Sequence, residues 1–114
     1  MSGAATRVSP LLARALSELA GKLRERFGAA VVDLRLFGSV ARGESHEDSD
    51  VDVAVVLTEV DWQTRRAVID LAVDIGLASG LSISPTIFAR ETWDRFRAQE
   101  RPLVMDIERD GVPL

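Results

Sequence analysis

The stretch from Phe37 to Val53 constrains this chain most. An apolar segment ends at Phe37 and is followed by Gly38 and Ser39, and ten residues later Asp50 and Asp52 open a second apolar segment. Ten residues are too few for a parallel crossover that contains its own helix, so the two segments are predicted to be antiparallel strands. Ser39 and Asp50 are then expected at the same edge of one sheet.

The rest of the 114-residue chain alternates helical and strand patterns. Apolar residues recur with helical spacing from Val8 to residue 27, with Ser9 as the expected N-cap, Pro10 in the first turn and Gly28 after the end. The further elements expected are a strand over 31–37, a short helix over 39–43, a polar loop over 44–49, a strand over 51–57, a helix over 61–79 capped by Thr58 or Asp61 and stopped by Gly80, a strand over 81–88, a short helix with Trp93 and Phe96, and a helix from Pro102 to about Arg109.

These elements predict an α/β (α+β) fold, a small mixed sheet flanked by helices, in a single domain spanning residues 1–114. The strand over 51–57 is almost entirely apolar and is expected to be buried on both faces. Pro85 cannot donate to a β-ladder, so the strand over 81–88 is expected to have an unpaired or bulged side. The residues expected to face the core from the two later helices are Val68, Leu71, Ala72, Ile75, Ala78, Leu103, Val104 and Ile107.

Composition limits the class of function. Hydrophobic residues make up 46% and charged residues 28% of the chain, its formal net charge is −4, and it has no cysteine. With Lys and Arg scattered, direct binding of duplex DNA is not expected. No apolar run approaches the ~20 residues that cross a bilayer, so we expect no membrane association and a cytoplasmic location. The apolar first helix could cover the core or serve a homo-oligomer interface, and composition does not distinguish the two.

The central stretch contains groups suited to phosphate and metal. Gly38 lets the backbone approach an anion closely and Ser39 adds a hydroxyl, while residues two apart in a strand project from the same face and bring the Asp50 and Asp52 carboxylates together. Hard oxygen ligands favour Mg²⁺ or Mn²⁺, which would take further ligands from the phosphates of a nucleotide. Arg42 could reach the triphosphate, brace Asp52, or be a surface residue.

The joint pattern Gly38, Ser39, ten residues, Asp50, x, Asp52, with Arg42 and Gly43 between and Ser49 just before Asp50, resembles the signature of minimal nucleotidyltransferases of the DNA polymerase β superfamily. The resemblance implies that fold, Asp50 and Asp52 as catalytic Mg²⁺ ligands, and Gly38, Ser39, Arg42 and Ser49 in nucleotide binding. It further implies ATP as substrate and AMP transfer to a tyrosine of a HEPN toxin, with this chain as the antitoxin.

One departure from the family pattern leaves an alternative open. The superfamily's full site has a third carboxylate on a later strand, and the corresponding face here has Ser82, Ser84 and Thr86 instead. Asp70 and Asp74, on the preceding helix, are not expected to replace this carboxylate. A catalytically degenerate nucleotide-binding or partner-binding module is therefore the second hypothesis. Transfer to a small molecule is a third, disfavoured because so short a chain has little material for an acceptor pocket.

Several residues in and around this stretch have a simpler interpretation. His46 and the acidic loop residues Glu44, Glu47 and Asp48 are expected to be solvated. Trp62, Trp93 and Phe96 are expected to pack in the core or at its edge, and any of them exposed beside the site would be a candidate for contact with a partner.

Overall fold

The computed structural model describes residues 9–43 and 50–114. In chain order its elements are α2 (Pro10–Phe27), the 3₁₀ helix η1 (Gly28–Ala30), β1 (Val31–Phe37), α3 (Gly38–Arg42), β2 (Val51–Leu57), α4 (Trp62–Ser79), β3 (Ile83–Ala89), α5 (Arg90–Ala98), α6 (Pro102–Asp110) and β4 (Val112–Pro113). The expected order of helices and strands is confirmed, and η1 and β4 are additional.

The four strands form one mixed sheet in the order β3-β2-β1-β4. β1 pairs antiparallel with both β2 and β4, whereas β2 and β3 pair in parallel. The parallel pair is possible because α4 returns the chain to the edge at which β2 began. Both the predicted mixed sheet and the predicted antiparallel β1–β2 pair are confirmed.

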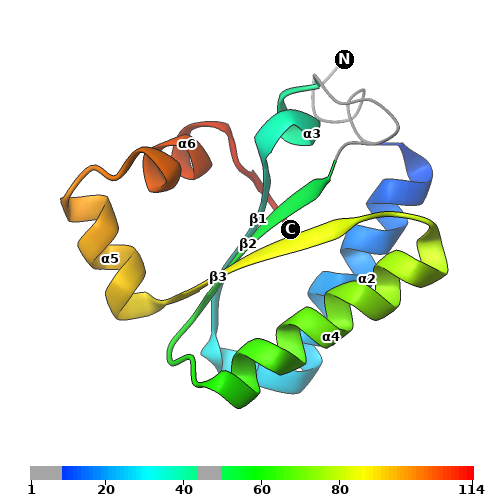
Figure 1. Ribbon diagram of the computed structural model, residues 1–114, viewed down its shortest axis with the longest axis horizontal. Coiled ribbons are helices and arrows are strands. Elements are labelled where there is room, and N and C mark those ends of the chain that lie inside the picture. The colour runs from blue at the N-terminus through cyan, green and yellow to red at the C-terminus, as the bar shows by residue number, and fades with distance from the viewer. Residues whose placement is uncertain (1–8, 44–49) are drawn as a thin grey trace.

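Helices cover both faces of the sheet (Figure 1). α2 and α4 pack on one face, in a hydrophobic cluster that includes Leu19, Leu23, Val53 and Val68. α5 and α6 pack on the other face, in a cluster that includes Ala54, Val56, Trp93 and Ile107. β2 therefore contributes to both clusters, and every one of its residues except Asp52 is buried, as its apolar sequence predicts.

Local signals in the sequence determine where the long helices begin and end. The Ser9 hydroxyl accepts a hydrogen bond from the Leu12 backbone N–H at 3.2 Å, which caps α2. At α4 the cap is Asp61, the second of the two expected candidates, whose Oδ1 accepts from the Thr64 N–H at 2.7 Å. Gly80 follows α4 with a φ of 70°, a conformation that favours glycine.

Some boundaries and faces were predicted wrongly. β3 begins at Ile83 instead of residue 81, because the Leu81 N–H still donates to the Gly76 carbonyl at 2.9 Å and closes the end of α4. Ala78 is exposed because α4 packs through Val68, Ala72 and Ile75 instead. Leu103 is 45% exposed, since the packed side of α6 is defined by Val104 and Ile107.

The aromatic residues divide between core and surface. Trp93 is buried and Phe96 partly buried, and both rings pack edge-on against Phe88 with centroid distances of 5.0 and 6.5 Å. Trp62 is 71% exposed, so the prediction that it packs in the core or at its edge is wrong. It begins α4, after the end of β2, whereas Asp50 and Asp52 lie where β2 starts.

Candidate functional site

The pairing of β1 with β2 brings the turn after β1 next to the first residues of β2. Phe37, the last residue of β1, is the register partner of Asp52. Gly38 and Ser39 follow at once as the first residues of α3, and both are partly exposed. The two halves of the motif, ten residues apart in the chain, therefore meet at one end of the sheet.

Gly38 and Asp52 are in close contact. Gly38 has a φ of 79°, which strains any other residue, and a Cβ added there would collide with Oδ2 of Asp52. Two independent reasons therefore require glycine at this position. The backbone of the turn and the carboxylate share a space that leaves no room for a side chain.

Asp50 and Asp52 are close enough to interact electrostatically. The pKa of Asp52 is raised above its ordinary value of 3.8, first by burial and then by the negative charge of Asp50, while the positive charge of Arg42 opposes both. Arg42 lies at the exposed end of α3. Arg42 is thus a surface residue whose charge acts on Asp52, and its predicted contact with the triphosphate stays a prediction.

Ser82, the residue just before β3, contacts Asp50. The Ser82 hydroxyl donates a hydrogen bond to Oδ1 of Asp50 at 2.9 Å, and the Ser82 carbonyl accepts from the Val51 N–H at 2.8 Å. Ser84 is the register partner of Asp52. The sequence predicts both serines on the strand face where the superfamily has its third carboxylate. It does not predict the hydrogen bond from Ser82 to Asp50, because that bond depends on the register between β2 and β3.

No third carboxylate joins the pair in the part of the chain that the structure describes. Residues 9–43 and 50–114 contain no group of three or more His, Cys, Asp or Glu side chains arranged for a metal. Asp70 and Asp74 are exposed on α4, which packs on the sheet face opposite to that of Asp52, Ala54 and Val56. As expected, these two aspartates do not replace the missing group.

The remaining predicted site residue, Ser49, lies outside the described residues. The same holds for the expected polar loop over 44–49, which includes His46 and the acidic residues Glu44, Glu47 and Asp48. The site that can be described therefore consists of Gly38, Ser39, Arg42, Asp50 and Asp52, with Ser82 in contact with Asp50.

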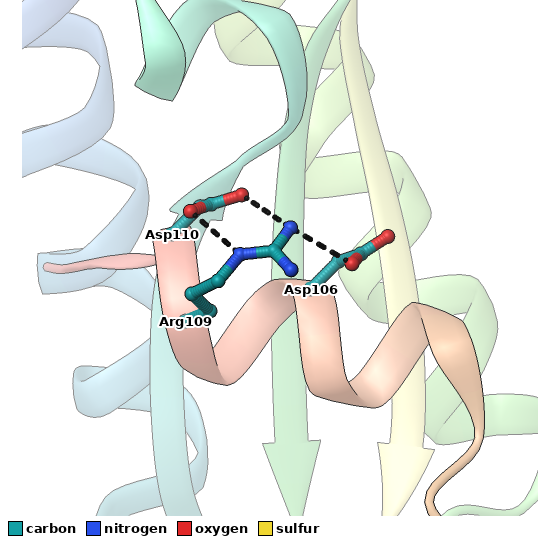
Figure 2. A network of polar contacts seen from close by, with 3 residues as sticks. All are labelled: Asp106, Arg109 and Asp110. Atoms are coloured by element: carbon teal, nitrogen blue, oxygen red, sulfur yellow. Dashed lines mark hydrogen bonds and ion pairs between the residues drawn. The ribbon is translucent and has the colours of Figure 1, made fainter.

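A second polar cluster lies on α6, which packs against α3 and β1. Figure 2 shows the Arg109 guanidinium between Asp106 and Asp110, with N–O distances of 3.0 Å to Asp106 and 3.0 and 3.1 Å to Asp110. Hydrogen bonds and the charge of Asp110, followed by that of Asp106, raise the pKa of Arg109. Because all three residues belong to one helix, the cluster stabilises the end of α6 and supplies no separate site.

Comparison with known proteins agrees with this geometry. A family model described as a nucleotidyltransferase domain matches residues 16–97. Protein adenylyltransferase MntA of Thermococcus cleftensis is 40% identical over 68 residues, covering 53% of this chain and 67% of that protein. A Methanocaldococcus jannaschii protein, named as a candidate protein adenylyltransferase, is 30% identical over 82 residues, covering 72% of this chain and 78% of its own.

Solved structures show the same fold. The structure of a candidate minimal nucleotidyltransferase superposes with a TM-score of 0.58 at 31% identity, covering 89% of this chain and 91% of that one. A toxin–antitoxin crystal structure with AMP-PNP also gives 0.58, at 22% identity, covering 84% of this chain and 69% of that one.

The fold, the match over residues 16–97 and the identity to these relatives show that the chain belongs to the nucleotidyltransferase domain family. The resemblance to minimal nucleotidyltransferases and the prediction of a nucleotidyl-transferring enzyme are confirmed. No helix in the described ranges combines the length and the apolar character that crossing a membrane requires.

Proposed function

We propose that this chain transfers AMP from ATP, with Mg²⁺ or Mn²⁺, to a hydroxyl of a partner protein, a HEPN-type toxin for which this chain is the antitoxin. The observation that carries the proposal is the contact of the Gly38 turn with the Asp52 carboxylate, beside Asp50. A phosphate group held by the turn would lie next to a cation held by the two carboxylates. ATP makes the cytoplasm the expected location.

The carboxylate pair fits a divalent cation. Burial and the charge of Asp50 both oppose ionisation of Asp52, and a bound cation would remove that opposition. Asp50 and Asp52 supply hard oxygen donors, which Mg²⁺ and Mn²⁺ prefer. When bound, the cation neutralises charge on the phosphates and aligns them for attack.

The turn and Arg42 are proposed to hold the triphosphate. α3 has only five residues, so the backbone N–H groups and the Ser39 hydroxyl, more than a helix dipole, would donate to phosphate oxygens. Gly38 lets this turn lie close to the Asp52 carboxylate, so a phosphate bound by the turn would be next to that carboxylate. Arg42 would add positive charge on the same side, and Ser49 is assigned to nucleotide binding by its place in the motif.

At the α-phosphorus the reaction forms one bond and breaks one, and the acceptor O–H bond breaks as well. The acceptor oxygen bonds to the α-phosphorus of ATP, the bond from that phosphorus to the oxygen bridging the β-phosphate breaks, and pyrophosphate leaves. The acceptor hydroxyl gives up its proton. Because no third carboxylate lies beside Asp52 among the described residues, we assign that proton to water or to a base of the partner.

The relatives support a toxin as the partner. MntA is named a protein adenylyltransferase, and two structural neighbours are toxin–antitoxin crystal structures, one with AMP-PNP and one of MntA with HpeT.

Ser84, the register partner of Asp52, favours a second candidate function. A hydroxyl replaces a carboxylate on the face where the superfamily has its third acid, so a module that binds the partner, with or without nucleotide, but transfers nothing is the alternative. Such a module would neutralise the partner by contact alone.

Incubation of the chain with ATP labelled at its α-phosphate, Mg²⁺ and the co-encoded partner separates the two functions. Adenylyl transfer predicts label on the partner with the wild-type chain and none with Asp50→Ala or Asp52→Ala variants that still bind the partner. An unlabelled partner in an intact complex would establish the non-catalytic module instead.

A further inference from the structure

Ser82 holds the start of β2 through two hydrogen bonds. Its carbonyl accepts from the Val51 N–H at 2.8 Å, and its hydroxyl donates to Oδ1 of Asp50 at 2.9 Å. The first bond fixes where Ser82 lies relative to Asp50, and the second acts on the Asp50 side chain itself. Ser82 therefore orders the one carboxylate of the pair that precedes the strand.

Asp50 needs such a contact more than Asp52 does. Asp52 lies within the β-ladder and is partly buried against Gly38, whereas Asp50 precedes the first residue of β2 and is exposed. An exposed carboxylate without a partner samples several rotamers, and fixing one of them costs conformational entropy when a ligand binds. A hydroxyl that donates to one carboxylate oxygen reduces that cost and leaves the other oxygen for a ligand.

We propose that Ser82 is a positioning residue of the site, whose hydroxyl orients the Asp50 carboxylate for a divalent cation. The inference rests on the proposed function, because it assumes that Asp50 is a cation ligand. Groups that hydrogen-bond to metal-binding side chains affect metal affinity by about 10- to 100-fold when they are removed. An exposed hydrogen bond contributes little to folding, so removing the Ser82 hydroxyl should affect the cation much more than the fold.

Ser84, inside β3, is a matched control for Ser82, which lies one residue before that strand. It projects from the same face as Ser82, two residues further on, and is exposed like Ser82. Ser82 donates to Asp50, but within the described residues Ser84 makes no side-chain hydrogen bond. Ser82→Ala and Ser84→Ala each remove one side-chain hydroxyl, and only the first removes a contact to a carboxylate.

The test is Mn²⁺ binding to the full chain without nucleotide, measured from the electron paramagnetic resonance signal of free Mn²⁺. Ser82→Ala should raise the Kd by about 10-fold or more, and Ser82→Thr, which keeps the hydroxyl, should stay within about 3-fold of wild type. Ser84→Ala should also remain near wild type. Circular dichroism and thermal unfolding check that the variants are folded.

The outcomes separate this inference from the proposed function. If the wild-type chain binds Mn²⁺ and Ser82→Ala binds it equally well, the positioning role is wrong while the cation site stands. Equal weakening by Ser82→Ala and Ser84→Ala would also overturn it, because the effect would then not depend on the hydrogen bond. If neither the wild-type chain nor any variant binds Mn²⁺, the proposed cation site itself fails.

Discussion

Residue 38 and the carboxylate of Asp52 share a space that only glycine permits. The positive φ and the missing Cβ are separate requirements. The first concerns the backbone conformation of residue 38, and the second concerns the space that the Asp52 carboxylate occupies. Gly80 meets the first requirement alone: its φ is 70°, and a Cβ there would meet nothing within 4 Å. The chain thus contains an internal control for the contact.

Gly38→Ala should abolish binding of Mg²⁺ and ATP, whereas Gly80→Ala should leave it intact. Both substitutions impose an unfavourable φ, at a cost of about 1–2 kcal/mol each, but only the alanine at 38 displaces the Asp52 carboxylate. Isothermal titration calorimetry measures the binding. Urea unfolding measures the loss of folding free energy that the unfavourable φ causes in both variants. Unchanged binding by a folded Gly38→Ala variant would contradict the assignment of this turn to the site.

Asp52→Asn should stabilise the metal-free chain near neutral pH and abolish cation binding. In the folded state, burial and the charge of Asp50 raise the pKa of Asp52. The stability linked to this group is therefore fully present below its ordinary pKa and is lost as the pH rises through the pKa of the folded state. Asparagine resembles the protonated form, and its advantage should shrink as pH falls toward the ordinary value of 3.8.

Thermal unfolding in EDTA across this pH range measures the effect. The expected result is a higher Tm for the variant near pH 7 and a converging Tm in acid. Asp70→Asn, on the exposed surface of α4, is the control and should change little. A variant less stable than wild type at neutral pH would show that the carboxylate is not under the repulsion described here.

At the scale of the elements, α4 connects the site to the rest of the fold. It begins at its Asp61 cap, crosses one face of the sheet and returns the chain to the edge where Ser82 meets Asp50. Close packing at its C-terminal end depends on Gly76, where a Cβ would lie 2.6 Å from the Leu81 carbonyl oxygen. Gly21, inside α2, has nothing within 4 Å of the same position.

Alanine at these two helical glycines should therefore have opposite effects. Gly21→Ala should stabilise the protein by about 0.5–1 kcal/mol, because alanine restricts the unfolded chain and adds no clash. Gly76→Ala should destabilise it by about 1–3 kcal/mol, because the new methyl group pushes the chain leading into β3. Urea unfolding measures both values, and a stabilising Gly76→Ala would contradict the packing described for α4.

At the scale of the whole molecule, the candidate site lies at a rim of the sheet, where β1 ends and β2 and β3 begin (Figure 1). Helices pack on both sheet faces, so we expect a ligand to approach along this rim. Any ligand that binds only the folded chain stabilises it by RT ln(1 + [L]/Kd), a gain that grows with the ligand concentration relative to Kd.

Saturating Mg²⁺ and ATP should therefore raise the Tm. At a concentration 100 times Kd the gain is about 2.7 kcal/mol, or roughly 10 °C for a domain of this size. EDTA should reverse the shift, and an Asp50→Ala, Asp52→Ala double variant should show none. The absence of any shift for the wild-type chain would contradict the proposed nucleotide and metal site.

The sequence by itself determined the elements and the chemical character of the site. Caps at Ser9 and Asp61 and the left-handed glycine at 80 act within a few residues, so they can be read locally. The short connection after Ser39 also sufficed to predict that β1 and β2 are antiparallel, and hence that Gly38, Ser39, Asp50 and Asp52 meet.

Only the tertiary structure decided which residues contact one another across elements. The Ser82–Asp50 hydrogen bond depends on the β2–β3 register, the exposure of Trp62, Ala78 and Leu103 depends on how the helices rotate onto the sheet, and the glycine requirement at 38 depends on the position of Asp52. These are contacts between distant segments. Their energies depend on packing in three dimensions, and no pattern along the chain encodes that packing position by position.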